Sequence, residues 1–342
     1  MRLSSPQFWW RAPGVPSTLL APVADLYGRI ATRNLDKGQR AETGVPVLCV
    51  GNPTVGGAGK TPCAIALGQA AIGLGRKPGF VSRGYGRKGR GTLLVDPERQ
   101  TSRETGDEPL LLARIAPTAV GADRAAAARL LIEEAGCDII IMDDGFQSAR
   151  LKTDLSLLLV DGQRGLGNWR VFPAGPLRAP IEDQTRHADG FVVVGKGPAG
   201  ADIASLAGRS NRPVHYGAIT PTKAERFAGM RVLAFAGIGD PAKFLASLSA
   251  VGARVEDSRV FPDHHPYTAE DVAALSAAAW RQGLQLVTTR KDAVRLAGGA
   301  DALRLFATEC DVLDVTFRFD VEGTAERLIR ETLANFRRRR FG

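Results

Sequence analysis

The stretch Val45–Pro62 constrains this chain more than any other, because it joins an apolar run to a glycine-rich turn. Residues 47–50 are apolar and rich in valine, a pattern typical of a buried parallel strand. The turn ends in Gly59, Lys60 and Thr61, where a helical pattern begins. A strand, a glycine loop, Gly-Lys-Thr and a helix in this order are the sequence form of a phosphate-binding loop, or P-loop.

The residue types of this loop suit a polyphosphate. Backbone N–H groups can surround phosphate only where side chains leave room, and the helix that follows adds the positive end of its dipole. Lys60 is predicted to reach the β- and γ-phosphates, and the Thr61 hydroxyl to bind Mg²⁺. The alternative, a glycine-rich turn with an incidental lysine, is disfavoured because strand, Gly-Lys-Thr and extra glycines coincide. The predicted nucleotide-binding residues are Thr54, Val55, Gly56, Gly57, Ala58, Gly59, Lys60 and Thr61.

Strand and helix patterns alternate through the rest of the chain, which predicts a P-loop NTPase-like, doubly wound parallel sheet followed by a second, smaller α/β domain. Further strands are expected at residues 78–82, 117–121, 138–142, 155–160, 191–194, 231–236, 286–288 and 312–315. The expected organisation is an amphipathic N-terminal segment at 1–42, a P-loop kinase domain at 43–212, an extended linker at 213–230 and a second α/β domain with a C-terminal helix and basic tail at 231–342.

Composition limits the possible partners. The 342 residues suffice for two domains, and 44% hydrophobic with 24% charged residues is the composition of a folded globular protein. The four cysteines show no ligand spacing, which predicts reduced thiols. The net charge of +9 suits nucleic acid, an anionic membrane or a phosphorylated substrate. Because no zinc-finger or RNA-binding motif accompanies the charge, we expect no nucleic-acid partner. No secretory signal or run of about 20 apolar residues is found.

The N-terminal segment differs from the rest of the chain. Trp9 and Trp10 stand beside Arg11, and apolar residues recur at helical spacing from Ser17 to Ile30. Tryptophan and arginine on an amphipathic helix suit a membrane interface, where indole lies at headgroup depth and arginine meets anionic lipid. A helix that packs its apolar side against the main domain fits the same pattern, so both interpretations stay open at this point.

Carboxylates follow the P-loop at two places. The strand expected at 138–142, apolar from Ile139 to Met142, is followed by Asp143 and Asp144. An acid at the end of such a strand can hold Mg²⁺ beside a P-loop. Asp107 and Glu108 begin another helical pattern, where a capping role is as natural as a catalytic one. Residues 82–91 form a loop rich in arginine and glycine, which suits an anionic ligand or a solvated turn.

Six motifs follow one another along the chain: Thr54–Pro62, Ser82–Arg87, Gly106–Pro109, Asp143–Gln147, Pro173–Arg178 and Asp263–His265. Taken together they resemble the tetraacyldisaccharide 4′-kinases, the lipid A 4′-kinases of Gram-negative bacteria, over nearly the whole chain. Like this chain at Thr54, the family lacks the first glycine of the usual P-loop. Ala179 departs from the family pattern, since many members carry an acid there.

The resemblance implies an ATP- and Mg²⁺-dependent kinase of lipid A biosynthesis. Its reaction transfers the γ-phosphate of ATP to the 4′-hydroxyl of an acylated glucosamine disaccharide 1-phosphate, giving lipid IVA. Its location is the cytoplasmic face of the inner membrane, to which it binds peripherally, and we expect a monomer. This location favours the membrane interpretation of the N-terminal helix.

The resemblance also implies roles for individual residues. Asp107 would be the catalytic base, paired with His264 in preference to His265, and Lys60 would act on the phosphates. Thr61, Glu108, Asp143 and Asp144 would support Mg²⁺. The residues expected to contact the disaccharide or its phosphate are Arg83, Tyr85, Arg124, Gln147 and Arg178.

Other P-loop proteins and a non-catalytic protein are the competing interpretations. A GTPase-like metallochaperone needs an Asn-Lys-x-Asp base reader, which neither Thr289–Asp292 nor Thr222–Glu225 matches. An ATP-dependent ligase shares the P-loop chemistry and stays a competitor. A membrane-bound ATP-sensing scaffold is disfavoured because the chain offers candidates for acid, base and metal ligand together.

Overall fold

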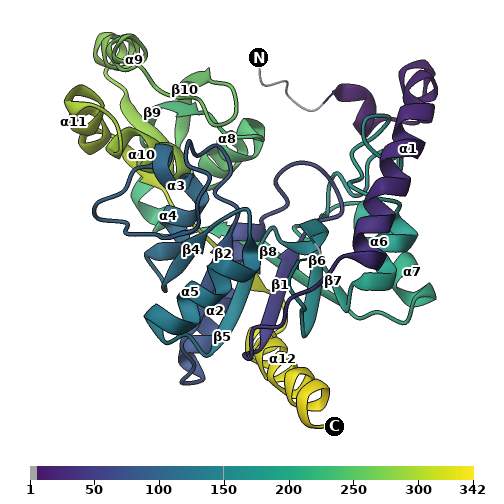
Figure 1. Ribbon diagram of the computed structural model, residues 1–342. Helices are drawn as coiled ribbons and strands as arrows, with labels where there is room; N and C mark the ends of the chain where they lie inside the picture. Colours follow the sequence, from purple (N-terminus) through teal and green to yellow (C-terminus); the bar gives the residue numbers. More distant parts are fainter. Residues whose placement is uncertain (1–5, 149) are drawn as a thin grey trace.

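The computed structural model describes residues 6–148 and 150–342 and contains two α/β units (Figure 1). The larger unit holds a nine-stranded sheet in the order β13-β8-β7-β6-β1-β5-β2-β4-β3, and the smaller one a four-stranded sheet in the order β10-β9-β11-β12. The strands are β1 (Val47–Gly51), β2 (Pro78–Ser82), β3 (Leu93–Leu94), β4 (Thr118–Val120), β5 (Ile139–Asp143), β6 (Leu155–Asp161), β7 (Gly190–Val194), β8 (Val214–Pro221), β9 (Arg231–Ala236), β10 (Arg254–Val260), β11 (Gln285–Thr289), β12 (Asp311–Leu313) and β13 (Val315–Phe319).

Helices cover both faces of the large sheet. One buried cluster joins it to α1, α5, α6 and α7, and a second joins it to α2, α4 and α12. The helices are α1 (Val15–Lys37), α2 (Lys60–Gly73), α3 (Ser102–Thr105), α4 (Asp107–Ala113), α5 (Arg124–Ala135), α6 (Ile181–His187), α7 (Ala199–Arg209), α8 (Pro241–Ala250), α9 (Ala269–Gln282), α10 (Arg290–Ala297), α11 (Asp301–Glu309) and α12 (Thr324–Phe341), with 3-10 turns η1 (Gln7–Trp10), η2 (Phe146–Ser148) and η3 (Ala224–Phe227). The predicted doubly wound α/β fold is confirmed.

The centre of the large sheet places the P-loop beside the acidic end of β5. Strands β1 and β5 are buried along their whole length, which only continuous apolar runs tolerate. They pair in parallel, with Val50 opposite Asp143. Because the carboxyl ends of parallel strands meet at one edge, the loop after β1 and the carboxylates after β5 lie together there.

The C-terminal part of the chain differs from the expected domain division. Strand β8 lies in the segment expected as an extended linker, yet it pairs with β7 in the large sheet. The chain later returns from the small unit, and β13 pairs antiparallel with β8 while α12 packs on α2. In β13, apolar Val315, Phe317 and Phe319 alternate with polar residues, as in a strand with one buried face. Residues 315–342, expected in the second domain, therefore belong to the larger unit: β13 extends its sheet, and α12 packs on one face of that sheet.

The small unit contacts the large unit near the carboxyl edge of the large sheet. Helix α10 contacts α4, the helix that begins at Asp107. On another side, Arg164 of the large unit lies 2.9 Å from Asp240, which caps α8. A second pair, between Asp161 and Lys243, joins the same two segments. These contacts hold residues of both units close to the P-loop.

Helix α1 lies at the edge of the large unit (Figure 1). Most of its large apolar residues are exposed. Its contact with the domain is made by Ser17, Ala24, Gly28 and Leu35, which are buried. A Cβ atom on Gly28 would meet Pro180 at 3.6 Å, so a small residue allows close packing there. The exposed apolar residues are Val15, Leu19, Val23, Leu26, Tyr27 and Ile30.

These contacts bear on the two interpretations of α1, a helix at a membrane interface or a helix packed by its apolar side on the main domain. The apolar side does not pack on the main domain. Trp9, expected at a membrane interface, is buried instead, and its indole N–H donates a hydrogen bond to the Pro173 carbonyl at 3.0 Å. Trp10 packs under the Arg164 guanidinium. Within the described residues, no helix combines the length and the apolar character needed to cross a bilayer. Residues 1–5 of the expected N-terminal segment lie outside the described part of the chain.

Candidate active site

The P-loop wraps the amino end of α2. Gly59 caps this helix with a left-handed backbone (φ 81°), and a Cβ atom there would lie 2.7 Å from Ile219. The left-handed backbone favours glycine at this position, and any side chain there would also have to displace the end of the Ile219 side chain. The Lys60 ammonium donates to Asn52 Oδ1 at 3.0 Å and to the Gly56 carbonyl at 3.3 Å. Acceptors within and directly before the P-loop thus hold the Lys60 ammonium beside the loop.

Asp143 lies directly behind this loop. The Thr61 hydroxyl donates a hydrogen bond of 2.8 Å to Asp143 Oδ2. The other oxygen, Oδ1, is buried without a hydrogen-bond partner among the described residues. Burial, with the nearby Glu108 charge, raises the pKa of Asp143 to about 7. A buried carboxylate with one unsatisfied oxygen costs free energy unless a cation compensates it.

These residues fit a divalent cation. Among the residues that the structure describes, no three His, Cys, Asp or Glu side chains form a metal cage. Mg²⁺ needs no such cage, because it is usually held by one or two protein ligands together with waters and substrate phosphates. The Thr61 hydroxyl and Asp143 supply hard oxygen ligands of the right kind, as in other P-loop proteins.

Asp144 connects the end of β5 to a more distant loop. Its backbone is left-handed (φ 57°), a conformation that non-glycine residues adopt rarely and at a cost of about 1–3 kcal/mol. The carboxylate receives two hydrogen bonds from Arg178, of 3.0 and 3.2 Å, and lies 3.8 Å from the Lys60 ammonium. These cations hold the pKa of Asp144 below its ordinary value although burial acts to raise it.

Arg178 and Gln147 point into the protein rather than towards open solvent. Besides Asp144, the Arg178 guanidinium donates to the Thr54 carbonyl at 3.0 Å and to Gln147 Oε1 at 3.3 Å. The Gln147 amide donates to the Asn52 carbonyl at 2.9 Å. Both residues thus hold the P-loop against the segment after β5. The resemblance implied that these same two residues contact the disaccharide or its phosphate.

Asp107 and His264 meet across the two units. Asp107 is the first residue of α4 and is 6% exposed, and His264 Nδ1 lies 2.9 Å from its Oδ2. An ionised carboxylate can only accept a hydrogen bond, so this geometry assigns the proton to Nδ1. His264 has a left-handed backbone (φ 58°). The neighbouring His265 instead lies 2.8 Å from Asp271, the acid of the capping box that begins α9.

Two cations of α10 face the two carboxylates of α4. Arg295 Nε lies 2.9 Å from Asp107 Oδ2, and the Lys291 ammonium donates to Glu108 Oε1 at 2.6 Å. Burial acts to raise the pKa of Asp107, but the His264 hydrogen bond and the Arg295 charge outweigh it and hold that pKa below its ordinary value. The Lys291 charge, aided by Lys60, likewise lowers the pKa of Glu108. Both acids are therefore ionised at neutral pH.

The arginine- and glycine-rich loop after β2 completes this edge. Arg83 and Tyr85 are exposed, and the Tyr85 ring centroid lies 5.4 Å from that of His264. Arg124, at the start of α5, is buried and donates to the Gly121 carbonyl at 2.5 Å. Burial, with the nearby Arg83 charge, lowers the pKa of Arg124 to about 10. Because the positive charges of Arg83 and Arg124 lie close together, this part of the site favours binding of an anionic group.

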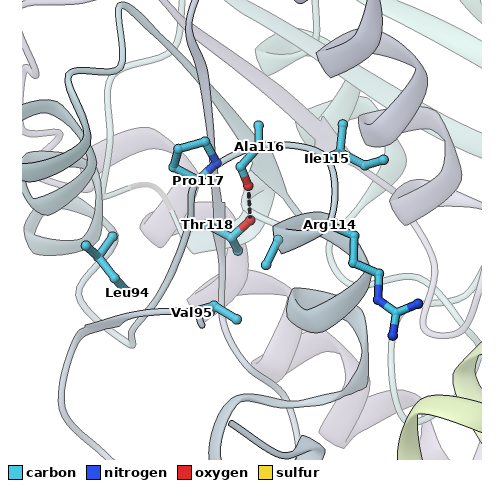
Figure 2. A pocket seen from close by; sticks show the side chains of 8 residues that line it. Leu94, Val95, Arg114, Ile115, Ala116, Pro117 and Thr118 are labelled. Carbon is cyan, nitrogen blue, oxygen red and sulfur yellow. Dashed lines mark hydrogen bonds between the residues drawn. The ribbon is translucent and has the colours of Figure 1, made fainter. Parts of the chain in front are cut away.

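A cavity elsewhere plays no part in this site. Figure 2 shows side chains of β3, the end of α4 and the amino end of β4 that line a surface hollow. The volume of this hollow is about 400 Å³. Thr118, at the first position of β4, donates there to the Ala116 carbonyl at 3.0 Å. The P-loop lies at the carboxyl edge of the same sheet, so the hollow is at the opposite edge.

Three residues at the site were not singled out from the sequence. Asn52 directly follows β1, is fully buried and shapes the loop by donating to the Thr54 and Gly56 carbonyls. Its place between a strand and a glycine loop was an available signal. Lys291 was considered only as part of a GTPase motif. The sequence around Arg295 does not indicate a role at the site. The one available signal was its spacing of four residues from Lys291, which places both on one face of a helix.

Comparisons with known proteins identify the family of this chain. The tetraacyldisaccharide-1-P 4′-kinase family matches residues 16–334. Curated tetraacyldisaccharide 4′-kinases from Brucella ovis and Brucella melitensis are 47% identical over 342 residues, which is 100% of this chain and of each relative. The crystal structure of LpxK from Aquifex aeolicus in complex with ATP superposes with a TM-score of 0.70 and 26% identity, and covers 93% of this chain and 100% of that one. The chain therefore belongs to the tetraacyldisaccharide 4′-kinase family.

Proposed function

We propose that this chain transfers the γ-phosphate of ATP to the 4′-hydroxyl of a tetraacylated glucosamine disaccharide 1-phosphate. The new bond joins the 4′-oxygen to the γ-phosphorus, the bond to the β–γ bridging oxygen breaks, and ADP leaves. The products are lipid IVA and ADP. The observation that carries the proposal is the Asp107–His264 contact of 2.9 Å, which joins the unit that carries the P-loop to the smaller unit.

Asp107 acts as the base in this proposal. The hydroxyl proton must leave during or after attack, and a positioned carboxylate can accept it. His264 and Arg295 both contact Oδ2, so neither occupies Oδ1. His264 fixes the orientation of the carboxylate and stabilises its charge.

The phosphate side of the reaction relies on Lys60, Thr61 and Asp143. Lys60 neutralises charge that develops on the γ-phosphoryl oxygens and the β–γ bridge. The Thr61 hydroxyl and Asp143 would hold Mg²⁺, with Asp144 and Glu108 nearby. When bound, Mg²⁺ supplies Lewis-acid neutralisation of the polyphosphate. Arg178 and Gln147 keep the loop rigid by their contacts with Asp144 and Asn52.

The acceptor sugar is placed near Tyr85 in this proposal. The ring of Tyr85 lies beside His264, so a sugar stacked on its exposed face would approach Asp107. Arg83 and Arg124 supply positive charge for the phosphate of the disaccharide. This assignment gives each end of the ligand a partner of suitable chemistry.

Helix α1 binds the membrane surface in this proposal. Its outward side carries six large apolar residues, with Leu19 75% exposed and Leu26 62% exposed. Exposed arginines, such as Arg29 and Arg33, flank this side and suit anionic headgroups. A monotopic attachment to the cytoplasmic face of the inner membrane would present the active site to a substrate whose acyl chains stay in the bilayer.

The test is phosphoryl transfer by the Asp107→Ala variant. The purified variant should bind ATP as the unchanged protein does, yet its turnover of the acylated disaccharide should fall at least about 100-fold, the scale of general base catalysis. Near-full turnover by this variant would remove Asp107 from the role of base.

A further inference from the structure

We propose that Arg295, on α10 of the small unit, is a positioning residue that fixes the carboxylate of Asp107 for attack. The inference rests on the proposed role of Asp107 as the base and deepens it. Arg295 Nε and His264 Nδ1 both lie 2.9 Å from the same oxygen, Asp107 Oδ2. Arg295 and His264 of the small unit thus hold the carboxylate of Asp107, which belongs to the large unit.

Arg295 is itself held firmly. Its side chain is 6% exposed, and Nη1 lies 3.0 Å from Asp292 Oδ1, a carboxylate that is fully buried. Asp292 also accepts hydrogen bonds from the Gly237 N–H at 3.0 Å and from the Tyr267 hydroxyl at 2.8 Å. The guanidinium therefore starts from a rigid point in the small unit.

The same anchor reaches the loop that carries His264. Arg295 Nη1 is 3.5 Å from the His265 carbonyl, and the His264 N–H donates to the Gly237 carbonyl at 3.0 Å. A Cβ atom on Gly237 would lie 3.0 Å from Arg295 Nη1 and 3.1 Å from His265. Arg295, the histidine loop and Gly237 are thus packed as one body. Any movement of this body moves both partners of Asp107 together.

The contact between the guanidinium and Asp107 is an ion pair at short range, not a directed hydrogen bond. Arg295 Nε and Nη2 are buried without a hydrogen-bond partner among the described residues. Donors left unpaired in a buried place are costly, so the guanidinium charge needs carboxylates close by. Asp292 of its own unit lies 3.0 Å from Nη1 and Asp107 of the other unit 2.9 Å from Nε, so Arg295 links a fixed carboxylate to the Asp107 carboxylate.

The neighbouring contact repeats this arrangement. Lys291, four residues earlier and on the same face of α10, donates to Glu108. Adjacent carboxylates at the start of α4 thus face two cations one helical turn apart. When α10 docks on α4, it sets the position of the base and of the neighbouring acid at the same time.

The test compares Arg295→Met with Arg290→Met. Arg290 lies on the same helix and is ion-paired with Asp314, away from Asp107, so its variant removes a similar contact outside the site. Arg295→Met should lower kcat at least about tenfold while the KM for ATP stays within about twofold, because misplacing a reacting group by 1 Å costs up to about 100-fold. Arg290→Met should leave kcat within about twofold.

A double-mutant cycle separates positioning from a structural role. In the Asp107→Ala background, Arg295→Met should add less than about a twofold loss, since the group that it positions is absent. An equal loss in both backgrounds, or an unchanged kcat, would overturn the inference. If thermal unfolding shows that Arg295→Met does not fold, Arg295→Lys enters the same cycle with the same two outcomes. An active Asp107→Ala variant would refute the proposed base, whereas an inactive one with a silent Arg295→Met would refute only the positioning role.

Discussion

His264 Nδ1 lies 2.9 Å from Asp107 Oδ2, although the two residues come from different α/β units and are 157 positions apart in the chain. The adjacent His265 faces Asp271 at 2.8 Å in the same structure. Two neighbouring histidines of one motif therefore have separate surroundings, one at the base and one at a helix cap. This separation allows their roles to be distinguished by matched variants.

Substituting the two histidines should have different effects. His264→Ala should lower kcat about 10- to 100-fold, because Asp107 loses the donor that orients it. His265→Ala should leave kcat nearly unchanged and reduce the free energy of unfolding by about 1 kcal/mol, the scale of a capping contact. Steady-state kinetics and urea unfolding of both variants measure this. A larger kcat loss in His265→Ala than in His264→Ala would reverse the assignment.

Asp143→Asn should raise the Mg²⁺ concentration needed for half-maximal activity at least about tenfold, because it removes a charged ligand from the cation. Asp138→Asn, directly before the same strand and partly exposed, provides the control. Magnesium titrations of the two variants make the comparison, together with activity after chelation of the metal, which should be lost and return on adding Mg²⁺. Equal magnesium requirements in both variants would exclude Asp143 as a ligand.

The outward side of α1 should determine binding to lipid. Leu19→Glu combined with Leu26→Glu should weaken binding to anionic phospholipid vesicles at least about tenfold, since two exposed apolar residues are replaced by charges of the same sign as the lipid. Leu305→Glu, at an equally exposed leucine of α11, should leave vesicle binding unchanged. Co-sedimentation with vesicles measures both. Equal losses would mean that net charge alone governs binding.

Acid should loosen the attachment of α1 to the large unit. The hydrogen bond with His187 is the main cause that holds the pKa of Asp36 below its ordinary value, and the Arg186 charge adds to it. A depressed pKa contributes stability that is present above the unfolded value, near pH 4, and is lost as the pH falls through the folded value.

Hydrogen exchange on α1 measures this loosening. At pH 6 the amides of α1 should exchange faster in Asp36→Asn than in the unchanged protein, and this difference should shrink as the pH falls below about 4. A difference that stays constant over this range would show that Asp36 is not the titrating group.

The elements nearest the P-loop could be predicted from the sequence because their signals are local. Residues 47–50 and 139–142 are continuous apolar runs, and each predicted a strand that the structure contains. The doubly wound fold and the family are confirmed. The contact of Asp107 with His264 is the one implied by the resemblance, while its catalytic role stays a prediction.

The remaining features depend on contacts between distant parts of the chain. The return of β13 to β8 pairs residues about 100 positions apart, and nothing local to Val315 specifies that partner. Arg178 makes a bidentate contact with Asp144 that no local pattern predicts, and its contact with the disaccharide stays a prediction. Arg295 reaches the site only because α10 docks on α4, which no single segment encodes.

The central claim is tested most directly by incubating the purified protein with ATP, Mg²⁺ and a tetraacylated glucosamine disaccharide 1-phosphate, and then measuring the mass of the lipid. We predict that the lipid gains one phosphoryl group in the presence of ATP, and that ³¹P NMR of the product places this group on the 4′-oxygen. A lipid of unchanged mass, after incubation with folded protein that binds ATP, would contradict the account.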